Sequence, residues 1–326
     1  MKRSLGRRSF LRGALGAALV TPALLSWEER ALLAAQQQAP AKTKPATRGA
    51  MPTGKIGKIT ISRLICGGNL VSGFAHSRDL IYVAPLLKRY FTEEKIMETW
   101  ALCEEHGINT MVVSQSDPRA EMVYRKYVQQ GGTIQYIAQI RAEEDNLDAA
   151  VKKAVDGGAV GAFLHGGIGD VWVRDGKLPL IGMLIEIIKE HGLIAGVAGH
   201  ELRTIREIEK AGFEPDFYVK TLHHTNYWSF GGAGEKPEVI RNRADNYWCR
   251  DPQETIEFMA TVRRPWIAYK VLAAGAIRPR EGFQFAFANG ADFALVGMFD
   301  FQIREDVEIA NAVLAKNQKR SRAWMA

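Results

Sequence analysis

Residues 97–113, METWALCEEHGINTMVV, and residues 181–198, IGMLIEIIKEHGLIAGVA, repeat one pattern. In both stretches a segment with helical spacing of apolar residues ends at Glu-His-Gly, and a short apolar run follows. Glycine directly after a helix, with a buried strand close behind it, is typical of the αβ loops of alternating α/β folds. Each stretch therefore predicts a helix followed by a parallel strand.

The same pattern recurs along the chain and predicts eight strands and eight helices. We expect the strands at 62–68, 110–115, 134–140, 159–165, 194–200, 217–224, 266–273 and 293–299. We expect the helices at 92–106, 119–130, 146–156, 179–191, 202–211, 252–262, 280–289 and 304–315. Eight such units in about 260 residues indicate a (β/α)8 TIM barrel. A doubly wound open sheet is the alternative, but residues 66–73, CGGNLVSG, lack the GxGxxG spacing of its phosphate loop.

The first 35 residues are predicted to be a Tat signal peptide. Arg7 and Arg8 precede Ser-Phe-Leu, a short apolar run, and small residues around Ala34 and Ala35. This arrangement is typical of a twin-arginine export signal. An ordinary basic leader or an uncleaved lipid-facing anchor is the alternative. We expect the Tat translocon as a partner, a periplasmic or extracellular location, and no stable membrane anchor.

The rest of the chain divides into a linker, a barrel and a tail. Residues 36–53 are rich in Gln, Ala, Pro, Lys and Thr, which predicts a flexible linker. The barrel is expected over 54–316 and a C-terminal tail over 317–326. The leader holds six Lys or Arg and two Glu, so without it the formal net charge falls from +7 to about +3. No basic cluster with interleaved aromatic residues remains, and we expect no nucleic-acid partner. The three cysteines are far apart, which argues against a CxxC metal motif or a disulfide framework.

Polar side chains stand at the carboxyl ends of the predicted strands, where the sites of TIM barrels lie. In chain order they are Asn69, Ser114, Gln115, Gln139, Arg141, His165, His200, Glu201, Lys220, His223, His224, Lys270 and Asp300. We expect a small, sugar-like substrate to be bound by Asn69, Gln139, Arg141 and Asp300, with Tyr227 and Trp228 from the loop after the sixth strand. The two aromatic rings are suited to stack on a sugar, and equally to form a lid or an oligomer contact.

The sixth predicted strand carries Lys220 in the middle of an apolar run. Because an unpaired ammonium is costly to bury, Lys220 and Lys270 are expected to point into the barrel rather than into the helix layer. Side-chain alternation then turns Tyr218 and His224 inward with Lys220, and turns His223 outward. A bulge at the strand end would exchange the two histidines.

The strand-end histidines favour a metal site. His165, His200 and His224 end three neighbouring strands, and Glu201 follows His200. Imidazoles with a nearby carboxylate suit Zn²⁺, Mn²⁺ or Fe²⁺. We therefore expect a divalent metal on His165, His200 and His224, with His223 as the alternate ligand. The alternative is that these histidines bind substrate by hydrogen bonds or act as acids and bases.

Two inward lysines would support a different chemistry. Lys220 and Lys270 on neighbouring strands would lower each other's pKa, which favours a neutral amine able to form a Schiff base. VKT at 219–221 and YKVLAAGAI at 269–277 resemble class I aldolases of the deoxyribose-phosphate type. Alternatively, the lysines pair with carboxylates or hold an anionic substrate.

The order of motifs resembles that of the aldo-keto reductase superfamily. GKIGKITISRLICGGN, at 54–69, resembles the opening hairpin and first strand of that family. Four further stretches fall where the family has its second, fourth, fifth and eighth strands: EEHGINTMVVS at 104–114, FLHGGIGD at 163–170, GLIAGVAGHE at 192–201 and FALVGMFDFQIREDVEIA at 293–310. The resemblance covers most of 54–316 and implies an aldo-keto-reductase-like barrel with NADP as its cofactor.

The reductive tetrad of that family, Asp, Tyr, Lys and His, is not kept. Val112 stands where the resemblance places the Asp, and Gln139 stands where it places the Lys. The nearest tyrosine, Tyr124, falls inside a predicted helix, so only the histidine is kept, as His165.

These observations favour an exported barrel enzyme with metal-assisted lyase or isomerase chemistry on a carbohydrate-like or hydroxy-carbonyl substrate. The residues expected to act in catalysis are Lys220, Lys270, Glu201 and His165. The alternatives are an NADP-dependent oxidoreductase, a Schiff-base aldolase and a non-catalytic sugar-binding barrel.

Overall fold

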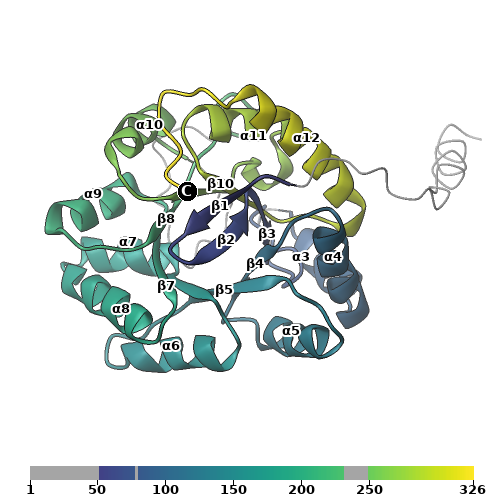
Figure 1. Ribbon diagram of the computed structural model, residues 1–326, viewed down its shortest axis with the longest axis horizontal. Helices are drawn as coiled ribbons and strands as arrows, with labels where there is room; N and C mark the ends of the chain where they lie inside the picture. Colours follow the sequence, from purple (N-terminus) through teal and green to yellow (C-terminus); the bar gives the residue numbers. More distant parts are fainter. Residues whose placement is uncertain (1–50, 78–79, 231–248) are drawn as a thin grey trace, which may run out of the picture. The chain divides into compact units, whose positions relative to one another are not determined.

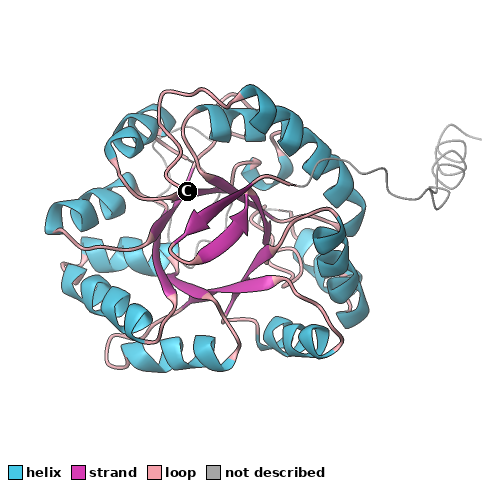
Figure 2. Cartoon of the chain, viewed as in Figure 1, coloured by secondary structure: helices cyan, strands magenta, loops and turns pink. Residues whose placement is uncertain are grey.

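Eight parallel strands close into a barrel, and helices surround it (Figure 1 and Figure 2). The computed structural model describes residues 51–77, 80–230 and 249–326. The (β/α)8 barrel predicted from the repeated helix–strand pattern is confirmed. The predicted signal peptide, 1–35, and the predicted linker up to residue 50 lie outside the described residues.

The barrel strands follow the circular order β10-β3-β4-β5-β6-β7-β8-β9. Their bounds are β3 Leu64–Gly67, β4 Thr110–Ser114, β5 Gln135–Ile140, β6 Gly161–Leu164, β7 Ile194–Gly199, β8 Phe217–Thr221, β9 Trp266–Tyr269 and β10 Phe293–Val296. The helices are α3 Val83–Tyr90, α4 Glu93–Glu105, α5 Pro118–Gln129, α6 Leu147–Asp156, α7 Gly166–Arg174, α8 Leu178–Glu190, α9 Leu202–Ala211, α10 Pro252–Thr261, α11 Pro279–Ala288 and α12 Ile303–Lys316, with short 3-10 turns η2 Ala273–Gly275 and η3 Asp300–Gln302.

All eight predicted strands and helices are present, and the helices begin and end within one residue of the predicted bounds. Two further helices, α3 and α7, do not follow from the sequence pattern. Helix α7 contains three glycines, which lower helix propensity and mask its periodicity. Helix α3 lies in the insertion after the first barrel strand and leaves Leu86 exposed.

A hairpin of β1 (Thr53–Ile56) and β2 (Ile59–Ser62) lies across the N-terminal end of the barrel (Figure 1). Ile56 and Ile61 are fully buried and pack with the barrel interior, which includes Ile137, Phe163 and Phe217. Burial of each such side chain contributes about 1.5–3 kcal/mol. The hairpin therefore fills this end with apolar side chains, and the strand-end polar residues lie at the opposite end.

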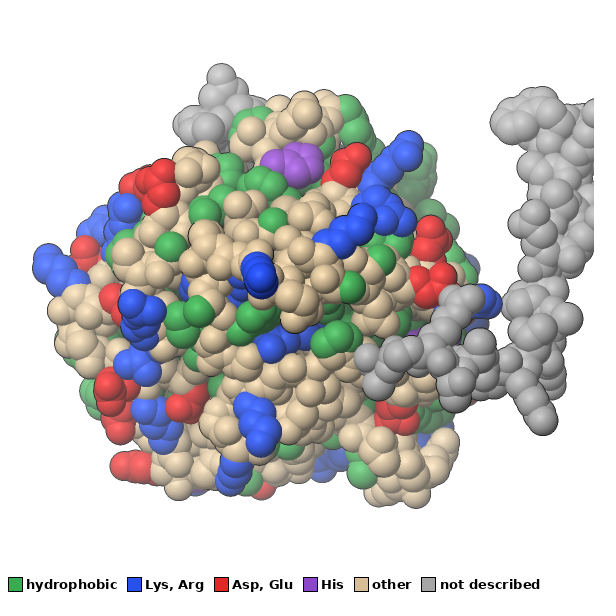
Figure 3. Space-filling model, turned by 45° about the horizontal axis from the view of Figure 1, so that its top comes forward, with side chains coloured by type: hydrophobic (Ala, Val, Ile, Leu, Met, Phe, Trp, Pro, Cys, Tyr) green, Lys and Arg blue, Asp and Glu red, His purple; other side chains and the backbone are tan. Residues whose placement is uncertain are grey.

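The surface mixes charges and exposes some apolar side chains. Basic and acidic side chains are interspersed over the face shown in Figure 3, rather than gathered into one basic patch. Ile81 and Tyr82, just before α3, are 72% and 73% exposed. Within the described ranges, none of the helices combines the length and the apolar character that a membrane span requires.

The segment after α12 packs against the barrel. Arg320 and Arg322 form ion pairs of 2.9 and 2.7 Å with Asp292, which is fully buried. The same carboxylate accepts hydrogen bonds from the backbone N–H groups of Trp266 and Met325. The predicted tail, 317–326, is thus joined to the strands β9 and β10 through one buried charge.

We expect Asp292→Ala to lower the free energy of unfolding by about 3–5 kcal/mol, because it leaves two buried guanidinium groups unpaired. Glu308→Ala is the control, since it removes an exposed ion pair of 3.1 Å with Arg304, and it should cost less than about 1 kcal/mol. Urea denaturation followed by circular dichroism measures both. Equal losses would show that the buried pair stabilises no more than a surface pair.

Candidate active site

The polar centre of the barrel mouth is a histidine held by a buried aspartate. His200 follows β7, and its Nδ1 lies 2.9 Å from Oδ2 of Asp170 in α7. Asp170 is 1% exposed and also accepts hydrogen bonds from the backbone N–H groups of His200 and Glu201 and from the hydroxyl of Thr204. These hydrogen bonds fix both the imidazole of His200 and the turn from β7 into α9.

The environment of Asp170 keeps its carboxyl group ionised and selects the tautomer of neutral His200. Burial alone would raise the pKa of Asp170, but the hydrogen bond and positive charge of His200 and the hydroxyl of Thr204 bring it below its usual value. In the neutral form of His200, the ionised carboxylate accepts the Nδ1 proton, which leaves Nε2 as the nitrogen without a proton. His200 is therefore arranged as a base, with Asp170 as its positioning residue.

His165, at the end of β6, is a neutral imidazole. Burial lowers the pKa of His165 to about 3, and the nearby charges of His200, Arg141 and Lys270 act in the same direction. Its Nδ1 is buried and has no hydrogen-bond partner among the described residues. A buried polar atom normally has a partner, so this nitrogen is suited to a hydrogen bond with a bound molecule.

Lys270 brings a positive charge to the mouth. It follows β9 directly and has the left-handed φ of 60°. Its Nζ lies 3.5 Å from both ring nitrogens of His76, and Nε2 of His76 lies 2.7 Å from Nδ2 of Asn69. The ring of Tyr269 has its centroid 5.6 Å from the ammonium of Lys270 and stacks on His200 at 5.4 Å. These side chains form a continuous row across the mouth.

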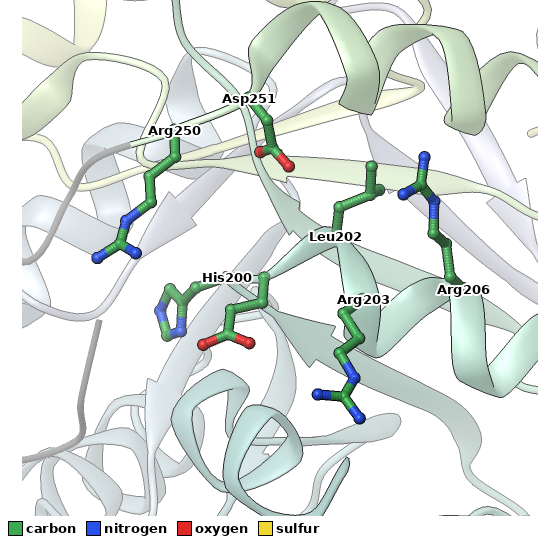
Figure 4. Close-up of a pocket in the computed structure, with 7 residues that line it drawn as sticks. His200, Leu202, Arg203, Arg206, Arg250 and Asp251 are labelled. Atoms are coloured by element: carbon green, nitrogen blue, oxygen red, sulfur yellow. The ribbon is translucent and has the colours of Figure 1, made fainter. Parts of the chain in front are cut away.

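A cavity of about 230 Å³ lies beside His200 (Figure 4). Its lining also includes Glu201, whose carboxylate lies 3.6 Å from Nη1 of Arg174. Burial raises the pKa of Glu201, the charge of Asp170 adds to this effect, and Arg174 is among the arginines that oppose it. The pKa of Glu201 is thus higher than that of an exposed carboxylate, which favours its use as a general acid.

The orientation expected for Lys220 is wrong. Val219 packs inside the barrel, whereas Tyr218 packs in the helix-facing core and donates its hydroxyl to Glu209 of α9. Lys220 therefore faces the helix layer, fully buried, and its Nζ donates to the backbone carbonyl of Thr221 at 3.1 Å. A main-chain oxygen meets the ammonium there, so the expected pair of inward lysines does not form.

The two histidines after β8 have other roles. Nδ1 of His223 donates to the carbonyl of His224 at 2.8 Å, and Nε2 accepts from the backbone N–H of Cys249 at 2.7 Å. The ring of His223 thus links the end of β8 to the chain before α10. His224 packs edge-on against Tyr227 and Phe285. The expected position of His224 inside the barrel is wrong, because the side chains that alternate with Val219 face the helix layer.

The residues present do not fit the expected metal. Among the residues that the structure describes, no three His, Cys, Asp or Glu side chains are grouped so that they could hold a metal ion. His165 and His200 lie within electrostatic reach of each other, but His224 packs against aromatic rings.

Two of the remaining residues predicted to bind substrate lie toward the mouth. Arg141 follows β5, contributes to the positive surroundings of His165, and lines a second cavity of about 290 Å³. Gln139 lies on β5 in register with Ser114 and Phe163, and by alternation shares the inward side of Ile137.

The other predicted substrate residues are engaged elsewhere. Asp300 forms an ion pair of 2.9 Å with Lys95 and accepts from the hydroxyl of Tyr90, which ties η3 to α3 and α4. Tyr227 packs in a small apolar cluster, and Trp228 is 85% exposed. The same loop carries two more aromatic residues suited to stack on a sugar, Tyr247 and Trp248, which lie outside the described residues.

Sequence reasoning missed Asp170, Tyr269 and His76. Asp170 is the only acid in GGIGDVWV, 166–173, and follows a strand-end histidine, His165, by five residues. A lone carboxylate in such a run is a signal that could have identified it. Tyr269 directly precedes Lys270, and side-chain alternation could have placed it inside the barrel. His76 lies in the insertion after β3, where no periodicity marks it.

Comparison with known proteins supports the fold. No protein-family model matches the chain, and no curated protein matches it. One similar solved structure is a Pseudomonas aeruginosa protein named "putative aldo-keto reductase", with 16% identity and a TM-score of 0.55 over 83% of this chain and 100% of that chain. A second structure so named, from the same organism, has 16% identity and a TM-score of 0.53 over 81% and 94%. These structures confirm the fold that the sequence motifs implied. Because the sequence identity is only 16%, they support the fold alone.

The pKa of His165 makes the stability of the fold depend on pH. Because this pKa is about 3 in the folded chain against an ordinary 6.5, unfolding takes up a proton at residue 165 below pH 6.5. The free energy of unfolding then falls by up to about 1.4 kcal/mol per pH unit between these values. His165→Gln removes this contribution, so its stability should fall less steeply below pH 6.5.

Urea denaturation of both proteins at pH 8, 6 and 5 measures the effect. At pH 8 both side chains are neutral, so the difference there reports packing alone. Parallel stability curves from pH 8 to pH 5 would contradict the assignment of a buried neutral ring.

Proposed function

We propose that the chain is an enzyme that moves a proton on a small hydroxy-carbonyl compound, in a reaction of lyase or isomerase type. The observation that carries this proposal is the 2.9 Å contact between Asp170 and His200 at the barrel mouth. Lys270 and the neutral ring of His165 flank this pair. A base, a cation and a neutral hydrogen-bonding group around one mouth suit proton removal next to a carbonyl.

In this reaction Nε2 of His200 takes a proton from the carbon beside the carbonyl. The electron pair moves onto the carbonyl oxygen, where the ammonium of Lys270 and the N–H of His165 stabilise the enolate. Return of a proton to the former carbonyl carbon completes an isomerisation, as the hydroxyl on the deprotonated carbon passes its proton to the former carbonyl oxygen. Loss of a hydroxyl group as water from the carbon on the other side of the deprotonated one completes a lyase reaction, with a carbon–carbon double bond left in the product. Glu201, with its raised pKa, supplies the second acid.

A nicotinamide-dependent oxidoreductase is the second candidate. The barrel mouth brings together the four side-chain types of the aldo-keto reductase tetrad, supplied here by Tyr269, Lys270, His165 and Asp170. Three of these residues stand at positions that the family does not use. NADPH retained through purification would favour this function. Failure to bind NADPH at millimolar concentration would exclude it.

The other expectations have weaker support. A Schiff base at Lys220 is disfavoured because that side chain faces the helix layer, and no particular contact favours a sugar-binding barrel without activity. We also propose export by the Tat route to the periplasm or the cell exterior, and the support for this is the twin-arginine motif of the sequence alone.

Proton exchange tests the role of His200 directly. The protein is incubated in D₂O with small hydroxy-ketones and hydroxy-acids, with and without phosphate groups, and loss of carbon-bound hydrogen is followed by NMR. We expect His200→Gln to slow exchange about 10²–10⁴-fold, because the base is lost. Asp170→Asn should slow it by a similar factor, because an amide favours the wrong tautomer of His200.

His106→Gln is the matched control, since it changes a histidine at the C-cap of α4 and should exchange at the wild-type rate. Circular dichroism shows whether each variant is folded. A folded His200→Gln protein that exchanges hydrogen at the wild-type rate would contradict the proposal.

A further inference from the structure

The cavity beside His200 is lined by three arginines. Figure 4 shows Arg250 on one side and Arg203 and Arg206 on the other. The remaining lining residues are His200, Glu201, Leu202 and Asp251. The cavity is thus continuous with the proposed base, and most of its charged groups are cations.

Two of the three arginines have unused hydrogen-bonding capacity. Arg206 is engaged, since it forms an ion pair of 2.7 Å with Glu254 and lies over the ring of Phe258. Arg203 makes no hydrogen bond or ion pair with any residue in the described ranges. Nη2 of Arg250 is buried and, among those same residues, has no hydrogen-bond partner. A buried donor of this kind is costly unless a ligand satisfies it.

The two acids of the cavity offset only part of this positive charge, because three arginines face them. Asp251 is at the N-cap of α10, where it accepts from the hydroxyl of Thr255 at 3.4 Å. Glu201 lies 3.6 Å from a further arginine, Arg174, which does not line the cavity. The first turn of α9, with its partial positive charge, begins at Leu202 on the cavity wall.

We propose that this cavity is an oxyanion subsite in which Arg203 and Arg250 hold a phosphate or carboxylate group of the substrate. The guanidinium fork matches both oxyanions, and charge-assisted hydrogen bonds of this type are strong. The inference rests on the proposed function, because it places the reacting carbon at His200 and the anionic group beside it. The substrate class is then a phosphorylated or carboxylated hydroxy-carbonyl compound.

Isothermal titration of the intact protein with inorganic phosphate, and separately with malonate, tests the subsite without any need for turnover. We expect at least one of the two anions to bind, and the tighter one identifies the oxyanion. Arg203→Gln and Arg250→Gln should each weaken that binding about tenfold or more. Arg304→Gln removes the same charge from an exposed ion pair on α12 and should leave the affinity unchanged.

Two outcomes overturn the proposal: no binding of either anion, or equal loss in Arg304→Gln, which would show that only overall charge matters. Failure of the proposed function has a different signature. If His200→Gln kept wild-type exchange while Arg203→Gln lost anion binding, the subsite would stand and the assignment of the base would fall.

Discussion

The carboxylate of Asp170 is the constraint on which the barrel mouth depends. It belongs to α7, yet it accepts hydrogen bonds from the backbone and ring of His200, from the backbone of Glu201 and from Thr204 in the first turn of α9. One buried charge thus fixes a strand end, a helix start and the orientation of a base. Because an ionised carboxylate is costly to bury unsatisfied, His200 cannot turn away without a penalty at Asp170.

Glycines let α7 bring this carboxylate into place. A Cβ atom at residue 169 would lie 2.8 Å from the carbonyl oxygen of Ala198, and one at residue 166 would lie 2.7 Å from the hydroxyl of Tyr269. Gly169 therefore permits the close approach of α7 to the backbone of β7, and Gly166 leaves room for the side chains of Tyr269 and His200. The same glycines lower helix propensity, which is why the helix that carries the central acid is one of the two that the sequence pattern did not predict.

The fold could be predicted from the sequence because most units repeat the helix–glycine–strand pattern, and the strand-end positions of His165, His200 and Lys270 follow from it. The orientation of Lys220 could not, because the reasoning assumed that an ammonium would avoid the helix layer, where a backbone carbonyl in fact meets it. Asp170 could not be paired with His200 either, since the two are 30 residues apart and only folding brings them together.

The backbone after β9 carries a further consequence. Lys270, Ala273 and Ala274 have φ values of 60°, 44° and 56°, and a non-glycine residue in the left-handed region costs on the order of 1 kcal/mol. A chain selected only for thermal resistance would favour glycine at these positions, yet glycine at 270 would remove the amine from the mouth. Laboratory evolution for heat tolerance, without a screen for turnover, would therefore favour replacement of Lys270 by glycine. At this residue the substitution that raises stability is the one that lowers activity.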